Sequence, residues 1–232
     1  MPSHQRIALH HWHAEHGARF ADSDGWQVPA VYSTVEREMK ASREGVALAD
    51  ISAFAKFSLL GKGVPELALA LGGDSPASEP RGVATLAVGD LALACRLTDD
   101  HLFLLASTTS PAVLDERLAY LPADSSVVRW DATSAHAGFC LVGPRGDEVL
   151  RGLTALDITP SQLPPGSCAE TGLAGVHALL VRPAGQAPPS VRVYVSWDLA
   201  EYVWERLLAA GRRRGTIPLG LEALRALGLA AC

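Results

Sequence analysis

The stretch FSLLGKGVPEL at residues 57–67 recurs as FCLVGPRGDEV at residues 139–149. Each copy has an apolar strand, a glycine turn and a helix that opens with an acidic residue, Glu66 or Glu148, which suits the positive end of a helix dipole. Further strands and a helix follow each copy. The pattern predicts an α+β fold made of duplicated split β-α-β halves, in which two antiparallel sheets are each backed by helices.

The expected organisation is one domain over residues 1–232. The half-repeats span about 50–131 and 132–210, and a C-terminal helix covers 219–228. Apolar periodicity and capping residues predict the other helices at 7–17, 33–44, 64–71, 111–121, 144–154 and 198–210. Strands are predicted at 51–60, 83–88, 91–97, 101–106, 126–131, 137–142, 168–174, 176–182 and 191–196, whereas 18–32 is predicted to be a loop.

Composition excludes several classes of protein. The chain has 232 residues, of which 48% are hydrophobic and 19% charged, so disorder is excluded. With a net charge of -5, the chain does not have the excess of basic residues that is typical of a nucleic-acid binder. No apolar run approaches the ~20 residues that span a bilayer, and the N-terminus lacks the apolar core of a signal peptide. We therefore expect a cytoplasmic protein with reduced cysteines, three of them small core residues: Cys95, Cys140 and Cys168.

Motifs in both halves resemble one superfamily. The N-terminal half is similar to the glycine-cleavage T-protein, the family of folate-dependent aminomethyltransferases. The C-terminal half is similar to the gamma subunit of heterotetrameric sarcosine oxidase, from the same superfamily. The first resemblance rests on Trp12-His13, Gly17-Ala18-Arg19, Gly25-Trp26-Gln27-Val28-Pro29 and Ala49-Asp50-Ile51-Ser52. The second rests on Leu156-Asp157-Ile158, Leu163-Pro164-Pro165-Gly166-Ser167-Cys168 and Ala174-Gly175-Val176.

The resemblance implies a central cavity for tetrahydrofolate, framed by the two repeated sheets, and a fold without the C-terminal barrel of a full T-protein. Several family positions have changed. Of the family's aspartate pair only Asp90 remains, and Leu91 occupies the catalytic place. Arg192 replaces the glutamate that grips the pterin, and Phe54 replaces a methionine that walls it.

The exchange at Arg192 bears directly on the cofactor. A pterin presents a donor-rich, guanidine-like edge that a carboxylate matches with paired hydrogen bonds. Arginine has donors only, and leaving buried donors unpaired costs about 1–3 kcal/mol each. Tetrahydrofolate therefore stays a candidate cofactor whose usual pose this exchange disfavours.

The candidate site residues each have a structural alternative. Asp90 is either a general base in the cavity or a turn residue. Arg192 alternates with apolar neighbours, so it either lines the cavity and binds an anion or lies on a solvated sheet face. Lys56 and Arg96, within strands, have the same two alternatives.

No metal site is expected. His10, His11, His13 and His16 lack acidic or cysteine partners at metal-ligand spacing, so they are expected at the surface. Cys168 and Glu170 share a strand face as a nucleophile and a base would, yet a structural thiol is favoured. Phosphate-loop, dinucleotide-binding and nucleophile-elbow motifs are absent from the sequence.

Two functions follow from the resemblance. One is a degenerate, non-catalytic subunit of one-carbon or methylamine metabolism, similar to the sarcosine oxidase gamma subunit and partnered by a flavoprotein or another oxidoreductase subunit. The alternative is a tetrahydrofolate-dependent aminomethyl or methyl transferase, or an enzyme that uses the same cavity for another small-molecule ligand. The changed residues favour the first function.

Overall fold

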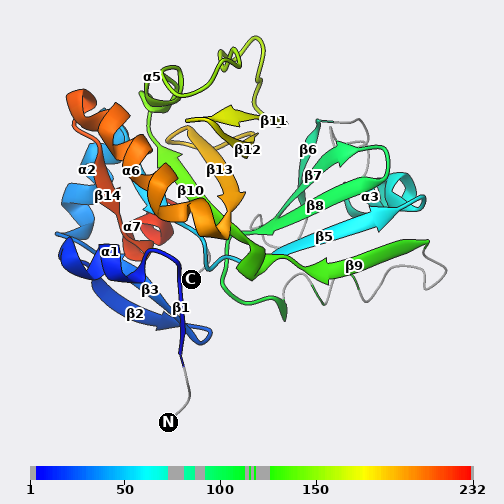
Figure 1. Cartoon of the computed structure of the whole chain (residues 1–232), viewed down its shortest axis with the longest axis horizontal. Coiled ribbons are helices and arrows are strands. Elements are labelled where there is room, and N and C mark those ends of the chain that lie inside the picture. Colours follow the sequence, from blue (N-terminus) through cyan, green and yellow to red (C-terminus); the bar gives the residue numbers. More distant parts are fainter. Residues whose placement is uncertain are drawn as a thin grey trace.

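The fold is built around two large sheets. The computed structural model describes residues 4–72, 81–86, 92–112, 115, 118 and 126–230. One sheet has six strands, in the order β11 (Ser167–Leu173), β12 (Val176–Arg182), β13 (Ser190–Ser196), β10 (His136–Val142), β4 (Ala47–Asp50) and β14 (Ile217–Leu219). The other has five, in the order β6 (Val83–Leu86), β7 (Ala92–Thr98), β8 (His101–Ala106), β5 (Lys56–Gly61) and β9 (Val127–Asp131). Figure 1 shows them as two lobes, with the five-stranded sheet on the right.

The topology confirms the duplicated α+β arrangement. The order β6-β7-β8-β5 in one sheet is matched by β11-β12-β13-β10 in the other, and the neighbours in both series are antiparallel. In each half the first strand, β5 or β10, is followed directly by a helix, α3 (Val64–Gly72) or α5 (Gly146–Leu150). The two copies of the quoted motif thus occupy equivalent places.

The motif glycines have equivalent backbone conformations. Gly61 and Gly143 have φ angles of 145° and 130°, which L side chains rarely adopt. A Cβ atom on Gly61 would lie 1.7 Å from the carbonyl oxygen of Ser126, and one on Gly143 would lie 2.4 Å from that of Gly45. Both turns therefore require glycine, which explains why this residue recurs.

A third, small sheet corrects one prediction. Residues 18–32, predicted to be a loop, form the antiparallel hairpin of β2 (Arg19–Ser23) and β3 (Trp26–Val31), and β1 (Gln5–Arg6) pairs parallel to β3. The turn uses Asp24 and Gly25 with φ angles of 49° and 82°. Apolar side chains of β3 are buried, so tertiary packing stabilises a hairpin whose glycine and proline suggested a loop.

Other boundaries also move. The strand predicted at 51–60 begins at Lys56, and β4 precedes it. The other α-helices with described bounds are α1 (His10–Glu15), α2 (Val35–Glu44), α6 (Ala200–Gly211) and α7 (Leu221–Ala226), with 3-10 turns at Thr133–Ala135, Trp197–Leu199 and Arg212–Arg214. The helices predicted at 7–17, 144–154 and 219–228 are therefore shorter than expected. The helix predicted at 111–121 falls mostly outside the described residues.

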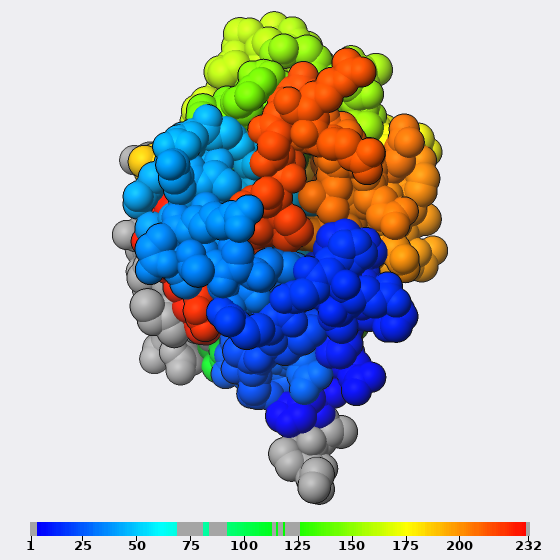
Figure 2. Space-filling view, turned by 90° about the vertical axis from the view of Figure 1, so that its left-hand side faces the viewer, coloured from blue at the N-terminus to red at the C-terminus, as the bar shows by residue number. Residues whose placement is uncertain are grey.

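The two large sheets share a buried interior, which we call the inner cluster. Helices α1, α5 and α6 cover the opposite face of the six-stranded sheet, and α3 covers that of the five-stranded sheet. In Figure 2 the N-terminal segment, in blue, lies between the light-blue segment that contains α2 and the orange segment that contains α6. Within the described residues, no helix is long and apolar enough to cross a membrane. The sheets contribute to the inner cluster Val83, Leu93, Cys95, Phe103, Leu105, Ala47, Ala49, Cys140, Val142, Cys168, Leu179, Val181, Tyr194 and Leu219.

Candidate functional site

Arg192 lies within a row of residues that crosses the six-stranded sheet. On its two sides its Cα partners are Val181 of β12 and Cys140 of β10, and Cys168 pairs with Val181. Directly paired residues project to the same face of a sheet, so the row shares one face. Its other members belong to the inner cluster. Arg192 therefore projects from β13 toward the interior between the sheets.

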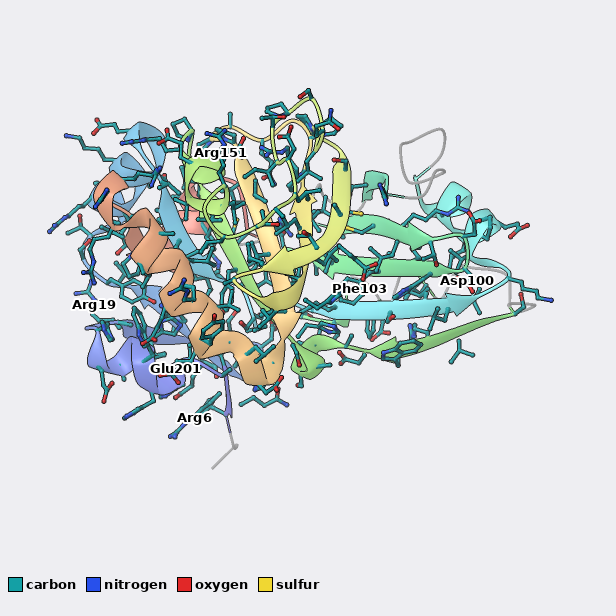
Figure 3. The ribbon with its side chains drawn as sticks, turned by 45° about the horizontal axis from the view of Figure 1, so that its top comes forward. Arg6, Arg19, Asp100, Phe103, Arg151 and Glu201 are labelled. Atoms are coloured by element: carbon teal, nitrogen blue, oxygen red, sulfur yellow. The ribbon has the colours of Figure 1, made fainter. Side chains whose placement is uncertain are left out.

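The five-stranded sheet supplies the opposite wall. Cys95 is fully buried, and the neighbouring thiol of Cys168, across the junction of the sheets, helps to raise its pKa. Phe103 meets the Tyr194 ring edge-on, with centroids 6.3 Å apart. Figure 3 places Phe103 toward the six-stranded sheet and Asp100 farther out. Cys95, Cys140 and Cys168 are free and buried, as the sequence predicted.

The guanidinium of Arg192 is buried and only partly hydrogen-bonded. Arg192 is 2% exposed, which excludes the solvated-face alternative. Its Nη2 donates to Ser107 Oγ at 2.8 Å, whereas its Nη1 has no hydrogen-bond partner in the part of the chain that the structure describes. The buried hydroxyl of Tyr194, two residues along the same strand face, is likewise unpartnered. Burial raises the pKa of Tyr194 to about 12, although the guanidinium opposes this shift.

Phe54 and Lys56 are also buried. Phe54 is 4% exposed and belongs to the inner cluster. Lys56 starts β5, and its Nζ donates to the carbonyl oxygens of Ser52 at 2.8 Å and Phe54 at 2.7 Å. Burial lowers the pKa of Lys56 to about 7, although Asp50 and Asp131 oppose the shift. The ammonium group thus bridges two carbonyl groups of the segment that leads into β5, and its burial carries a desolvation cost.

This lowered pKa gives a pH dependence of stability. Between the folded value of about 7 and the unfolded value of 10.5, the unfolded chain holds a proton that the folded chain has lost. The contribution of Lys56 to the free energy of unfolding is therefore expected to rise with pH in this window, by up to ~1.4 kcal/mol per pH unit, and to be flat below it. Urea unfolding from pH 7 to 10 measures the slope.

Two lysine variants isolate this effect. The free energy of unfolding of Lys56→Met is expected to rise less steeply with pH than that of the wild type over the same range, because the substitution removes the titrating group. Lys62→Met, at an exposed lysine, is expected to keep the wild-type slope. Equal slopes in the wild type and Lys56→Met would show that Lys56 does not titrate in this window.

The structure separates Arg96 from these residues. Arg96 pairs with Leu102, on the face of β7 opposite to Cys95, and is 6% exposed. Its guanidinium lies 3.3 Å from Asp99 and 3.4 Å from the carbonyl oxygen of Thr98, in the turn between β7 and β8. Arg96 therefore lies outside the inner cluster. Asp90 lies outside the described residues.

A second buried polar group, which the sequence did not predict, lies on the other face of the six-stranded sheet. His13, expected at the surface, has a fully buried side chain whose Nε2 is 2.9 Å from Asp50. Its Nδ1 is 2.7 Å from the Tyr32 hydroxyl, and its ring meets Trp204 edge-on. Asp50 also accepts a hydrogen bond from the Ser52 backbone. His13 and Asp50 both belong to the family motifs quoted above, but those motifs did not indicate that the two side chains pair, because they are 37 residues apart in the chain.

These groups do not fit a pterin in the pose that the resemblance implies. Among the described residues, Glu38 and Asp50 carry buried carboxyl groups, and both are engaged. Glu38 accepts hydrogen bonds from the backbone of Tyr32, Ser33 and Gly220, and Asp50 binds His13. At Arg192 the inner cluster would set hydrogen-bond donors against the donor-rich edge of the pterin, and donors cannot pair with donors. In the described part of the chain, no group of three or more metal-ligating side chains comes together.

Comparisons with known proteins agree with this architecture. A family model described as the GCVT N-terminal domain matches residues 9–232. Aminomethyltransferases of Anoxybacillus flavithermus and Geobacillus thermodenitrificans are each 28% identical over 98% of this chain. The chain spans 64% of the length of these relatives.

Two solved structures share the fold. The glycine cleavage system aminomethyltransferase T of Bartonella henselae has a TM-score of 0.75 and 20% identity, over 96% of this chain and 61% of its own. A chain of the heterotetrameric sarcosine oxidase of Corynebacterium sp. U-96 has a TM-score of 0.64 and 22% identity, over 90% of this chain and 95% of its own.

Proposed function

Because the chain belongs to the GCVT N-terminal domain family, we propose that it is a non-catalytic, T-protein-like subunit that serves one-carbon or methylamine metabolism. In this role the chain is a structural subunit of an assembly, and a partner subunit carries out the chemistry. Residues 9–232 match the family model, so the assignment to the family covers almost the whole chain.

The observation that carries the proposal is the buried guanidinium of Arg192. Arg192 is 2% exposed, and the resemblance implies that it stands in the place of the carboxylate that grips the pterin in the family. A pterin bound in the usual pose would leave buried donors facing donors, at about 1–3 kcal/mol for each unpaired group. This exchange removes the recognition on which tetrahydrofolate-dependent transfer depends.

The proposed partner is a flavoprotein or another oxidoreductase subunit. Support comes from the sarcosine oxidase chain, which belongs to a heterotetramer and 95% of which is covered by the structural match. The likeness in fold favours a chain that works within an assembly.

Tetrahydrofolate-dependent transfer is the alternative function. It is favoured by the aminomethyltransferases that share 28% identity with this chain. The two functions differ in one measurable property, the affinity for tetrahydrofolate.

Tetrahydrofolate is expected not to bind. The test is calorimetric titration of the purified chain with tetrahydrofolate under reducing conditions, together with thermal unfolding. A micromolar site would stabilise the protein by about 4 kcal/mol at a thousandfold excess of ligand over Kd, so an unchanged Tm at millimolar ligand is informative. The absorbance of the ligand after the titration checks that it stayed reduced. Saturable micromolar binding would establish the transferase alternative instead.

A further inference from the structure

Arg192 differs from the other buried arginines in having no carboxylate partner among the described residues. Arg182, on the neighbouring strand, lies 2.7 Å from Asp147, and Arg96 lies 3.3 Å from Asp99. Within the described part of the chain, the guanidinium of Arg192 has one neutral acceptor, the hydroxyl of Ser107. The inner cluster therefore contains a permanent positive charge that no described side chain neutralises.

Such a charge is costly to bury. Buried ions in proteins are paired, because the loss of hydration is repaid only by a counter-charge and hydrogen bonds. The thiols nearest to Arg192 do not supply the counter-charge. Burial raises the pKa values of Cys95 and Cys140 even though the guanidinium opposes this shift, so both thiols stay protonated at neutral pH.

The unpartnered donors lie together. Nη1 of Arg192 and the hydroxyl of Tyr194 are buried and have no hydrogen-bond partner among residues that the structure describes, and both residues project from β13 to the same face. The Tyr194 ring lies over Gly138, where a Cβ atom would come within 2.9 Å of the ring. The absence of a side chain at Gly138 therefore allows the Tyr194 ring to take this position. The walls around the donors are apolar and include Phe103, Val181 and Cys140.

We propose that the inner cluster binds a small monocarboxylate, whose oxygens accept hydrogen bonds from Arg192 and Tyr194. A guanidinium matches a carboxylate through two parallel hydrogen bonds, and here one of its nitrogens and a phenol hydroxyl have no other partner. One fixed positive charge balances one negative charge, and the apolar walls suit a short aliphatic body. A phosphate dianion would bring a second, uncompensated charge. The inference goes beyond the proposed function, because a subunit without pterin chemistry can still hold such a ligand.

Titration with sodium acetate and sodium propionate tests this site. Thermal unfolding and calorimetry are run on the full chain at constant ionic strength, with sodium chloride and sodium phosphate as the comparison anions. Long equilibration is needed because the cluster is closed to solvent. The wild type is expected to show a saturable rise in Tm with either carboxylate and not with chloride or phosphate.

Four variants separate a ligand site from a structural arginine. Without acetate, Arg192→Met is expected to have a higher Tm than the wild type, because it removes a buried unpaired charge, and it is expected to lose the response to acetate. Tyr194→Phe and Ser107→Ala are expected to fold and to raise the Kd for acetate severalfold. Arg182→Met, which breaks a paired buried arginine, is expected to lower Tm and keep the response.

Several results would overturn the inference. These are a wild type that does not respond to the carboxylates, an equal response to chloride or phosphate, a response to acetate that survives in Arg192→Met, and a lower Tm for Arg192→Met without ligand. If Arg192→Met does not fold, an unchanged Kd in both Tyr194→Phe and Ser107→Ala overturns it. Binding of tetrahydrofolate would refute the proposed function, and the carboxylate titration would still decide this site separately.

Discussion

Replacing Gly143 with alanine is expected to lower the free energy of unfolding by about 4 kcal/mol or more, the range that marks a severe defect. Gly143 has a φ angle of 130°, and an added Cβ would lie 2.4 Å from the carbonyl oxygens of both Gly45 and Ser42. These atoms belong to the backbone at the end of α2, so they cannot move aside as a flexible side chain would. Urea unfolding followed by circular dichroism measures the loss.

Gly152→Ala is the matched control for this substitution. A Cβ atom on Gly152 would meet nothing within 4 Å, so the change is expected to stay within about 0.5 kcal/mol of the wild type. A Gly143→Ala protein as stable as the Gly152→Ala protein would show that the turn after β10 tolerates a side chain.

Asp50→Ala is expected to lower the free energy of unfolding by about 3 kcal/mol, the upper end of the cost of leaving a buried polar group without its hydrogen-bond partner. The carboxyl group of Asp50 is fully buried, lies 2.9 Å from His13 Nε2 and accepts a hydrogen bond from the Ser52 backbone. Its removal leaves the imidazole of His13 buried, with the hydroxyl of Tyr32 as its remaining partner among the described residues. Thermal and urea unfolding at pH 7 measure the loss.

Asp99→Ala provides the comparison for Asp50. The Asp99 side chain is 88% exposed, so water screens its charge although its partner Arg96 is buried, and its removal is expected to cost about 0–1 kcal/mol. If Asp50→Ala cost no more than Asp99→Ala, the Asp50–His13 pair would not hold α1 to the six-stranded sheet.

The repeated motif explains why the fold class could be predicted. Gly61 and Gly143 recur because their turns exclude a side chain, and a requirement of the backbone is visible in sequence. The hairpin of β2 and β3 was missed because Gly25 and Pro29 suggest a loop, whereas burial of Trp26 and Val28 stabilises strands. That burial depends on contacts with distant segments, which local pattern does not contain.

The candidate site was predictable only in part. Alternation along β13 predicted that Arg192 faces opposite to its valine neighbours, but it could not decide which face is interior, because both faces of this sheet are covered. The same ambiguity applied to Arg96, which lies on the other face of its own sheet. The partnership of His13 with Asp50 joins residues far apart in the chain, so the spacing of the histidines did not suggest it.

The most direct test of the central claim, that Arg192 gives the interior between the sheets a positive charge in place of a pterin-binding carboxylate, is one calorimetric comparison. The wild-type chain is titrated separately with tetrahydrofolate and with sodium acetate at the same ionic strength. The account predicts saturable heat with acetate and none with tetrahydrofolate. Saturable binding of tetrahydrofolate without binding of acetate would contradict it.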